Sequence, residues 1–449
     1  MFDDKTAQDP SGLRALVVEL LSHQASLNGA INFERALARV QSRQGLIPDV
    51  AAEEIDRCGR DTPPTLAEAI EHRARLGHPM VAILDAFSEK LSPESAEWLH
   101  YGVTTADVFR TVRMTQIHTC ADLFISAMAK LEADLAARAA QYRATPMIGR
   151  TLGRHALPIT FGQKLAIWTR DIRNCIDRLK AWKKRYPSGV ASGAVGTHSV
   201  MSDAGPKIEA DLMAELGLGQ PDAIDTKGSQ DVFAEFGSSL AIAARVFGRI
   251  AQEVFLLQGD DINEVSLSTN AIGSSTMPHK SNPTLCIEVM SRAREVSAAL
   301  PVMLEWIGII HERDSAQHGD TLEQLCIDMA QILSCMDGLL KSLRVNEARM
   351  AENLKRTKGA IMAEGVTVEL ARNIGRRSAH HLVGNAVKMM QSQNLSLAEA
   401  IAQDEKLAGV TVPDEASAIG LAPQMVDRQL EQLGYAVQNA PVESLSRSR

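Results

Sequence analysis

The chain has 449 residues and a formal net charge of −8, so it is long enough for a large core and for more than one domain. The negative balance without a basic run excludes a nucleic-acid partner, and no apolar stretch reaches the roughly 18 residues of a membrane-spanning helix. Residues 1–5 lack the features of a signal peptide, and the six cysteines have no metal-ligand spacing, so we expect a cytoplasmic protein with reduced thiols.

Apolar residues recur at helical spacing along most of the chain, and an aromatic content of only 4% favours packed helices over sheets. Prolines divide the first hundred residues into short helical segments. The longer predicted helices span residues 111–143, 157–184, 232–258 and 284–300. Residues 149–155 and 187–206 are predicted loops. Shorter helices are predicted again in residues 356–449.

The clearest of these helices covers residues 232–258. Its apolar residues recur every three or four positions and form one stripe, made of Leu240, Ala243, Ala244, Phe247, Ile250, Ala251, Val254 and Leu257. Helices of this length in a globular protein usually lie side by side in a bundle. We therefore predict an all-α fold with a long central helical bundle.

The most informative motif is the run GSSTMPHKSNP at residues 273–283. It contains too much Gly, Ser and Pro for a helix interior and lacks the alternation of a strand, so it is a predicted loop before the helix at 284–300. A helix N-terminus offers unpaired N–H groups and a partial positive charge, to which Lys280 adds a full one. A hydroxyl held there would have a lowered pKa and would act as a base, and the same donors would bind a carboxylate.

This run resembles the signature Gly-Ser-Ser-x-Met-Pro-x-Lys-x-Asn-Pro of the fumarase/aspartase superfamily. The resemblance covers nearly the whole chain and is greatest to the branch of adenylosuccinate lyase and 3-carboxy-cis,cis-muconate cycloisomerase. It implies small helical N- and C-terminal domains at 1–110 and 356–449, around a central bundle domain at 111–355. It also implies a homotetramer with active sites built from three subunits, and no metal or organic cofactor.

The resemblance assigns roles to residues of the motif. Ser274 corresponds to the catalytic base. The substrate-binding residues that it implies in this loop are Ser275, Met277, Lys280 and Asn282.

A second segment, HYGVTTAD at residues 100–107, resembles the branch pattern His-x-Gly-x-Thr-Ser-x-Asp. The resemblance implies that His100, Thr104 and Thr105 bind a substrate carboxylate, with Thr105 in place of the usual Ser. Considered alone, the segment fits a helix N-cap better. Upstream, His78 corresponds to a substrate-contacting histidine of adenylosuccinate lyases, and the alternative is a solvated loop histidine.

A third segment, GRTLGRHALP at residues 149–158, resembles Gly-Arg-Thr-His-x-Gln-x-Ala-x-Pro with two departures. Leu152 replaces the histidine regarded as the general acid in adenylosuccinate lyases, and cycloisomerases also have an apolar residue there. Arg154 replaces a substrate-binding Gln, which implies an additional negative charge on the ligand, since a guanidinium matches a carboxylate. The alternative is an ion pair with a protein carboxylate. His155, next to Arg154, is the candidate acid.

Two further positions bear on the substrate. Arg313, within His-Glu-Arg-Asp-Ser, corresponds to an arginine that binds substrate in this branch. Gln230 stands where relatives often have Arg, and residues 318–320 lack the Trp expected of a cycloisomerase.

Together these residues predict a lyase. Ser274, as an alkoxide, would remove a proton next to a carboxylate, and Lys280 and Asn282 would stabilise the resulting dianion. Cleavage of a C–N bond would then release fumarate from an N-substituted aspartate. The cations Arg154 and Arg110 favour a small polycarboxylate such as iminodisuccinate over a nucleotide.

Three alternatives remain. The first is a muconate-type cycloisomerase, which uses the same proton chemistry, and the second is an adenylosuccinate lyase-like enzyme. The third is a catalytically inactive helical scaffold, against which the presence of Ser274, Lys280 and Asn282 argues.

Overall fold

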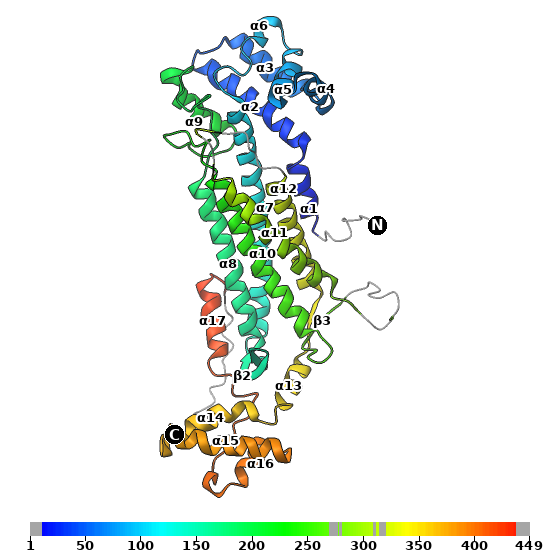
Figure 1. The fold of residues 1–449 in the computed structure, drawn as a ribbon, viewed down its shortest axis with the longest axis vertical. Coiled ribbons are helices and arrows are strands. Elements are labelled where there is room, and N and C mark those ends of the chain that lie inside the picture. The colour runs from blue at the N-terminus through cyan, green and yellow to red at the C-terminus, as the bar shows by residue number, and fades with distance from the viewer. Residues whose placement is uncertain (1–10, 269–276, 278–280, 309–310, 314–319, 437–449) are drawn as a thin grey trace. The chain divides into compact units, whose positions relative to one another are not determined.

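The computed structural model confirms an all-α fold (Figure 1). It describes residues 11–268, 277, 281–308, 311–313 and 320–436. Its α-helices are α1 (Leu13–Leu20), α2 (His23–Arg43), α3 (Asp49–Asp61), α4 (Leu66–Leu76), α5 (Pro79–Ser88), α6 (Pro93–Ala96), α7 (Thr105–Gln141), α8 (Phe161–Arg185), α9 (Gly205–Glu215), α10 (Asp231–Leu257), α11 (Thr284–Glu305), α12 (Thr321–Ser342), α13 (Glu347–Lys355), α14 (Ala363–Ile374), α15 (Arg376–Gln393), α16 (Leu397–Ala402) and α17 (Ala422–Gln432). Its strands are β1 (Pro146–Thr151), β2 (Arg154–Thr160), β3 (Val265–Leu267) and β4 (Leu343–Val345), which form two antiparallel pairs, β1 with β2 and β3 with β4.

Prolines and caps set the short N-terminal helices, as the sequence predicts. Pro48 is the N-cap of α3, while Pro79 and Pro93 occupy the first turns of α5 and α6. This placement costs no hydrogen bond, because the first N–H groups of a helix have no partner within it. Helix α4 begins with a capping box formed by Thr65 and Glu68.

The long helices agree with the predicted ones. The predicted stripe of residues 240–257 lies on α10, and all eight of its members are buried. Helix α11 begins at Thr284, directly after the Ser/Gly/Pro-rich motif, as expected. In the described part of the chain, no helix is both long enough and apolar enough to cross a membrane.

One predicted loop is wrong. Residues 149–155 belong to the hairpin of β1 and β2, in which Arg150 pairs with His155 and Thr151 pairs with Arg154. The helix predicted from residue 157 therefore begins only at Phe161, because residues 157–160 still belong to β2. Local periodicity missed the hairpin because its strands are held by pairing with each other.

The chain divides into two compact units, and the first consists of residues 1–127, 175–248 and 288–337. One core of this unit includes Phe33 and Leu37 of α2, Ile55 of α3, Phe87 of α5 and Leu212 of α9, all of them buried. This core fixes the N-terminal helices to one another and to the beginning of α7.

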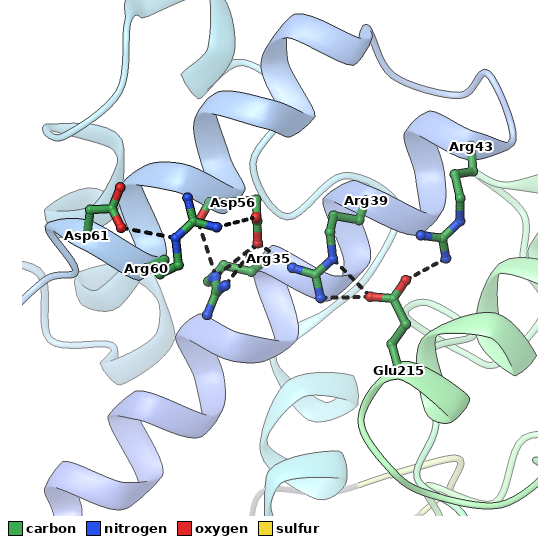
Figure 2. A network of polar contacts seen from close by, with 7 residues as sticks. All are labelled: Arg35, Arg39, Arg43, Asp56, Arg60, Asp61 and Glu215. Atoms are coloured by element: carbon green, nitrogen blue, oxygen red, sulfur yellow. Dashed lines mark hydrogen bonds and ion pairs between the residues drawn. The ribbon is translucent and has the colours of Figure 1, made fainter.

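An ion network joins three helices of the same unit (Figure 2). Arg39 of α2 pairs with Asp56 of α3 and, at 2.7 Å, with Glu215 of α9. Arg35 reaches Asp56 at 3.0 Å, and Arg43 reaches Glu215 at 2.5 Å. Ion pairs near the surface contribute only about 0–1 kcal/mol each to the free energy of unfolding. Because Asp56 and Glu215 each pair with two arginines of α2, their main effect is to fix the orientation of α3 and α9 on α2.

The second unit consists of residues 128–174, 249–287 and 338–449. It contains the hairpin and a separate core with Val366 and Leu370 of α14, Val383 of α15 and Leu397 of α16. The predicted boundaries of three domains are not tested by this division and stay a prediction.

Candidate functional site

A cavity of about 980 Å³ lies within the first unit. Residues of α2, α4, α5, α7 and α10 line it, together with residues between 306 and 323. Three residues predicted to bind substrate, His78, Thr105 and Arg313, lie in its wall. The fold thus brings together residues that are far apart in the sequence.

His78 is held at the beginning of α5. Its Nδ1 accepts a hydrogen bond from the backbone N–H of Val81 at 3.3 Å, so the side chain is the N-cap of the helix. With Nδ1 as acceptor, the proton of a neutral imidazole lies on Nε2. His78 is exposed and can therefore offer an N–H donor to a ligand oxygen in the cavity.

The beginning of α7 forms another part of the wall. Asp107 Oδ2 accepts the backbone N–H of Thr104 at 2.9 Å and that of Gly193 at 3.1 Å, so the segment is a helix start. Arg313 Nη1 donates to Thr104 Oγ1 at 3.4 Å, while Thr105 lines the cavity. The capping role and a substrate-binding role are therefore compatible.

A buried ion pair supports this helix start. Lys227 Nζ lies 3.0 Å from Asp107 Oδ1 and 3.3 Å from Asp225 Oδ2, and the side chains of Lys227 and Asp107 are 1% and 0% exposed. Burial raises the pKa of Asp107, and the Lys227 cation and the two N–H donors oppose that rise. Lys227 also donates to the backbone oxygen of Gly193. The pair therefore ties the segments around 193 and 225 to the beginning of α7.

His100 lies in a different setting. Its Nδ1 is 2.6 Å from Oε1 of Glu34, whose side chain is fully buried. Burial lowers the pKa of His100, but the Glu34 charge and hydrogen bond outweigh it, so the pKa is raised overall. Because His100 is not among the residues that line the cavity, its predicted role in substrate binding stays a prediction.

The second unit holds Arg154 and His155 on the hairpin. The two-residue turn is Leu152-Gly153, with φ of 52° and 74°, the left-handed pair of a type I′ turn. Such a conformation is unfavourable for a leucine, and Leu152 is fully exposed. Arg154 is exposed too, and no carboxylate among the described residues is within ion-pair distance of it. The alternative of an ion pair with a protein carboxylate thus has no support in this part of the chain.

The pKa of His155 bears on its candidate role as an acid. Partial burial and the neighbouring Arg150 cation lower this pKa. A neutral imidazole lacks the additional proton that a general acid donates, so the lowered pKa suits a hydrogen-bonding role better. The assignment of His155 as the acid stays a prediction.

A buried carboxylate anchors the base of the hairpin. Arg150 binds Glu264 through two hydrogen bonds of 2.8 and 2.7 Å, and Asn353 Nδ2 donates to Glu264 Oε1 at 2.9 Å. Glu264 is fully buried. This bidentate geometry fixes the strand that leads to Arg154.

The predicted base lies outside the described residues, as do Ser275 and Lys280. Of the same motif, Met277 is 43% exposed and Asn282 is partly buried. The backbone oxygen of Asn282 accepts the N–H of Thr284, the first residue of α11. The motif therefore ends at a helix N-terminus, where unpaired N–H groups favour an anion.

One group of side chains has donors suited to a metal ion. His72 Nδ1 lies 2.8 Å and Arg75 Nη2 lies 2.6 Å from the same oxygen of Asp85, and Glu89 is nearby. The Arg75 cation already neutralises Asp85. Among the described residues, we therefore interpret this group as an ion pair rather than as a metal site.

The comparisons with known proteins agree with this fold and show the family. A family described as lyase matches residues 67–297, which include His78, Thr105 and the motif of Ser274. The chain belongs to the fumarase/aspartase superfamily and is an enzyme of that superfamily.

Relatives of different activities are similar to the chain over most of its length. It is 33% identical to N-acetyl-S-(2-succino)cysteine lyase of Enterococcus italicus over 365 residues, 80% of each chain. It is 31% identical to adenylosuccinate lyase of Methanocaldococcus jannaschii over 422 residues, 91% of each chain. The structure of 3-carboxy-cis,cis-muconate lactonizing enzyme from Pseudomonas putida has a TM-score of 0.88 and 25% identity, covering 96% of this chain and 99% of that one.

Sequence reasoning missed several residues of these sites. Lys227 and Glu264 were not singled out, because burial of one charged residue against a distant partner leaves no local pattern. Asp107 was the residue from which a partner such as Lys227 could have been inferred. It belongs to the pattern that residues 100–107 resemble, and a carboxylate requires a cation when it is buried.

Proposed function

We propose that this enzyme is a lyase that cleaves the C–N bond of an N-substituted aspartate and releases fumarate. Its substrate is a small polycarboxylate such as iminodisuccinate. The observation that supports this substrate class best is the cationic wall of the cavity. Arg73, Arg110 and Arg313 line it, and none of them forms an ion pair with a described carboxylate.

The names of the relatives support the same kind of substrate. N-acetyl-S-(2-succino)cysteine and adenylosuccinate are both named for a succinyl group joined to a larger partner. Base-initiated elimination of such a group gives fumarate and releases the partner. In our proposal Ser274 removes the proton, and Lys280, Asn282 and the N-terminus of α11 stabilise the dianion.

A turnover assay tests this function. The purified enzyme is incubated separately with iminodisuccinate, a simple N-alkyl aspartate, adenylosuccinate and S-(2-succino)cysteine, and fumarate is followed by its ultraviolet absorbance. We expect the highest kcat/KM for iminodisuccinate. A preference for adenylosuccinate or for the sulfur adduct would overturn the substrate class, and no turnover of any adduct would overturn the lyase.

A cycloisomerase is the second candidate. It is favoured by the similarity to the lactonizing enzyme and by Leu152, an apolar residue at the position of the missing histidine. Loss of the ultraviolet absorbance of 3-carboxy-cis,cis-muconate, without fumarate production from any aspartate adduct, would support this candidate over the lyase.

We propose that the enzyme is a homotetramer with sites built from three chains. The long helices expose large apolar side chains that monomers usually bury: Ile167 of α8, Ile242 and Leu256 of α10 and Ile287 of α11 are 43–50% exposed. The exposed Leu152 turn also suits burial in a partner.

Sedimentation equilibrium should therefore give about four times the monomer mass of 48.7 kDa. Ile242→Asp should shift the protein toward smaller species, because a charge would be buried in the interface. Val50→Asp, at an exposed position of the short helix α3, is the matched control and should stay tetrameric. A monomer with full activity would refute the shared sites.

We predict that Arg154→Gln lowers kcat/KM for the native polycarboxylate by roughly ten- to a hundredfold, because loss of a charged hydrogen-bond partner costs about 1.5–3 kcal/mol. The loss should be smaller for an N-alkyl aspartate that lacks the distal carboxylates. Arg170→Gln, at an exposed position of α8, is the control. Equal losses for both substrates would mean that Arg154 does not select for an additional carboxylate.

A further inference from the structure

Arg110 lies on the face of α7 that forms the cavity wall. Thr105, Phe109 and Arg113 also line this cavity, since residues three or four positions apart are neighbours on a helix. The guanidinium carbon of Arg110 is 5.4 Å from the ring centre of Phe233 on α10, so one face of the cation is covered by an aromatic ring.

The guanidinium of Arg110 lacks the partners that a buried cation normally has. Its Nε and Nη1 are buried and have no hydrogen-bond acceptor in the part of the chain that the structure describes. Buried polar groups are nearly always satisfied, and a set of unsatisfied ones beside a cavity points to a ligand.

Arg110 remains a cation at neutral pH. Burial lowers its pKa to about 10, and the charges of Asp225 and Asp231 oppose that change. Both carboxylates have other partners: Asp225 pairs with Lys227 at 3.3 Å, and Asp231 accepts the hydroxyl of Tyr186 at 2.9 Å. Neither carboxylate accepts a hydrogen bond from Nε or Nη1 of Arg110, which have no acceptor in the described part of the chain.

The other buried or half-buried cations of the wall differ from Arg110. Arg113 pairs with Glu323 at 2.7 Å, and Lys227 pairs with Asp107 at 3.0 Å. Arg73 and Arg313 are exposed. Within the described wall, Arg110 is therefore the deeply placed cation that forms no direct ion pair with a carboxylate.

We propose that Arg110 is a specificity-determining residue that binds an additional carboxylate of the ligand in this cavity. This inference deepens the proposed function, because it assigns a residue to the polycarboxylate selectivity. A guanidinium offers parallel N–H donors that match the two oxygens of a carboxylate, and the Phe233 ring fixes its plane.

The test is a binding measurement that needs no turnover. Isothermal titration calorimetry compares tricarballylate, with three carboxylates, and succinate, with two, on the full-length enzyme and on Arg110→Gln. We expect the affinity for tricarballylate to fall by roughly ten- to a hundredfold, as for loss of a charged hydrogen bond, and that for succinate to fall much less. Arg110→Lys should give an intermediate loss, since it keeps the charge but not the planar donors.

A stability measurement separates this role from a structural one. Without ligand, Arg110→Gln should melt at or above the temperature of the parent enzyme, because it removes a charged group whose buried Nε and Nη1 have no described acceptor. An arginine with a structural role would lower the melting temperature and weaken both ligands alike. Equal losses for the two ligands, or no loss, would overturn the proposal. Because turnover is not measured, failure of the lyase function would not affect this result.

Discussion

Ser274→Ala should abolish most of the turnover of the enzyme. The variant lacks the proposed proton acceptor, and loss of a general base typically lowers kcat by about 10²–10⁴-fold. The elimination cannot begin without that proton transfer, so substrate binding should change far less than kcat. Fumarate release, together with exchange of the substrate proton with deuterated water, measures both the overall reaction and its first step.

Ser281→Ala is the matched control for this prediction. It removes a hydroxyl from the same motif, at a position to which no catalytic role is assigned. The control should keep most of the activity, and circular dichroism should show both variants to be folded. If Ser274→Ala turned over at the full rate, another group would be the base and the proposed mechanism would fail.

Lys227→Met should cause the largest loss of stability. The substitution leaves Asp107 buried without its cation, and removal of one partner from a buried ion pair costs about 3–5 kcal/mol. Urea denaturation at pH 7 measures the free energy of unfolding. Lys207→Met removes an exposed lysine whose ion pair spans four residues of α9, and it should change stability by less than about 0.5 kcal/mol.

The pH dependence of the Lys227→Met variant gives an independent check. Burial already raises the pKa of Asp107, and loss of Lys227 removes the charge that opposes this rise. A carboxyl with a higher pKa in the folded than in the unfolded state binds more protons when folded. The stability deficit should therefore shrink as the pH falls from 7 toward the unfolded carboxyl pKa of about 3.9. A deficit independent of pH would show that Asp107 is not the group left unbalanced.

The sequence by itself determined the fold class and the family, and it predicted the chemistry. The stripe on α10 could be predicted because a helix repeats every 3.6 residues, so its buried face is visible in a single segment. The motif at 273–283 could be interpreted because its residues act together within one loop. The breaks at Pro48, Pro79 and Pro93 followed from the missing N–H of proline.

The tertiary structure alone decided which distant side chains meet. The hairpin of β1 and β2 was missed because strand pairing is a contact between segments, and the Glu264 carboxylate that anchors it is more than a hundred residues from Arg150. The sequence already suggested Arg110 as an extra cation. Only the packing of α7 against Phe233 and the buried pair of Lys227 with Asp107 revealed that its Nε and Nη1 have no acceptor among the described residues. Burial and pairing of charges depend on the whole fold, which is why local patterns leave them undecided.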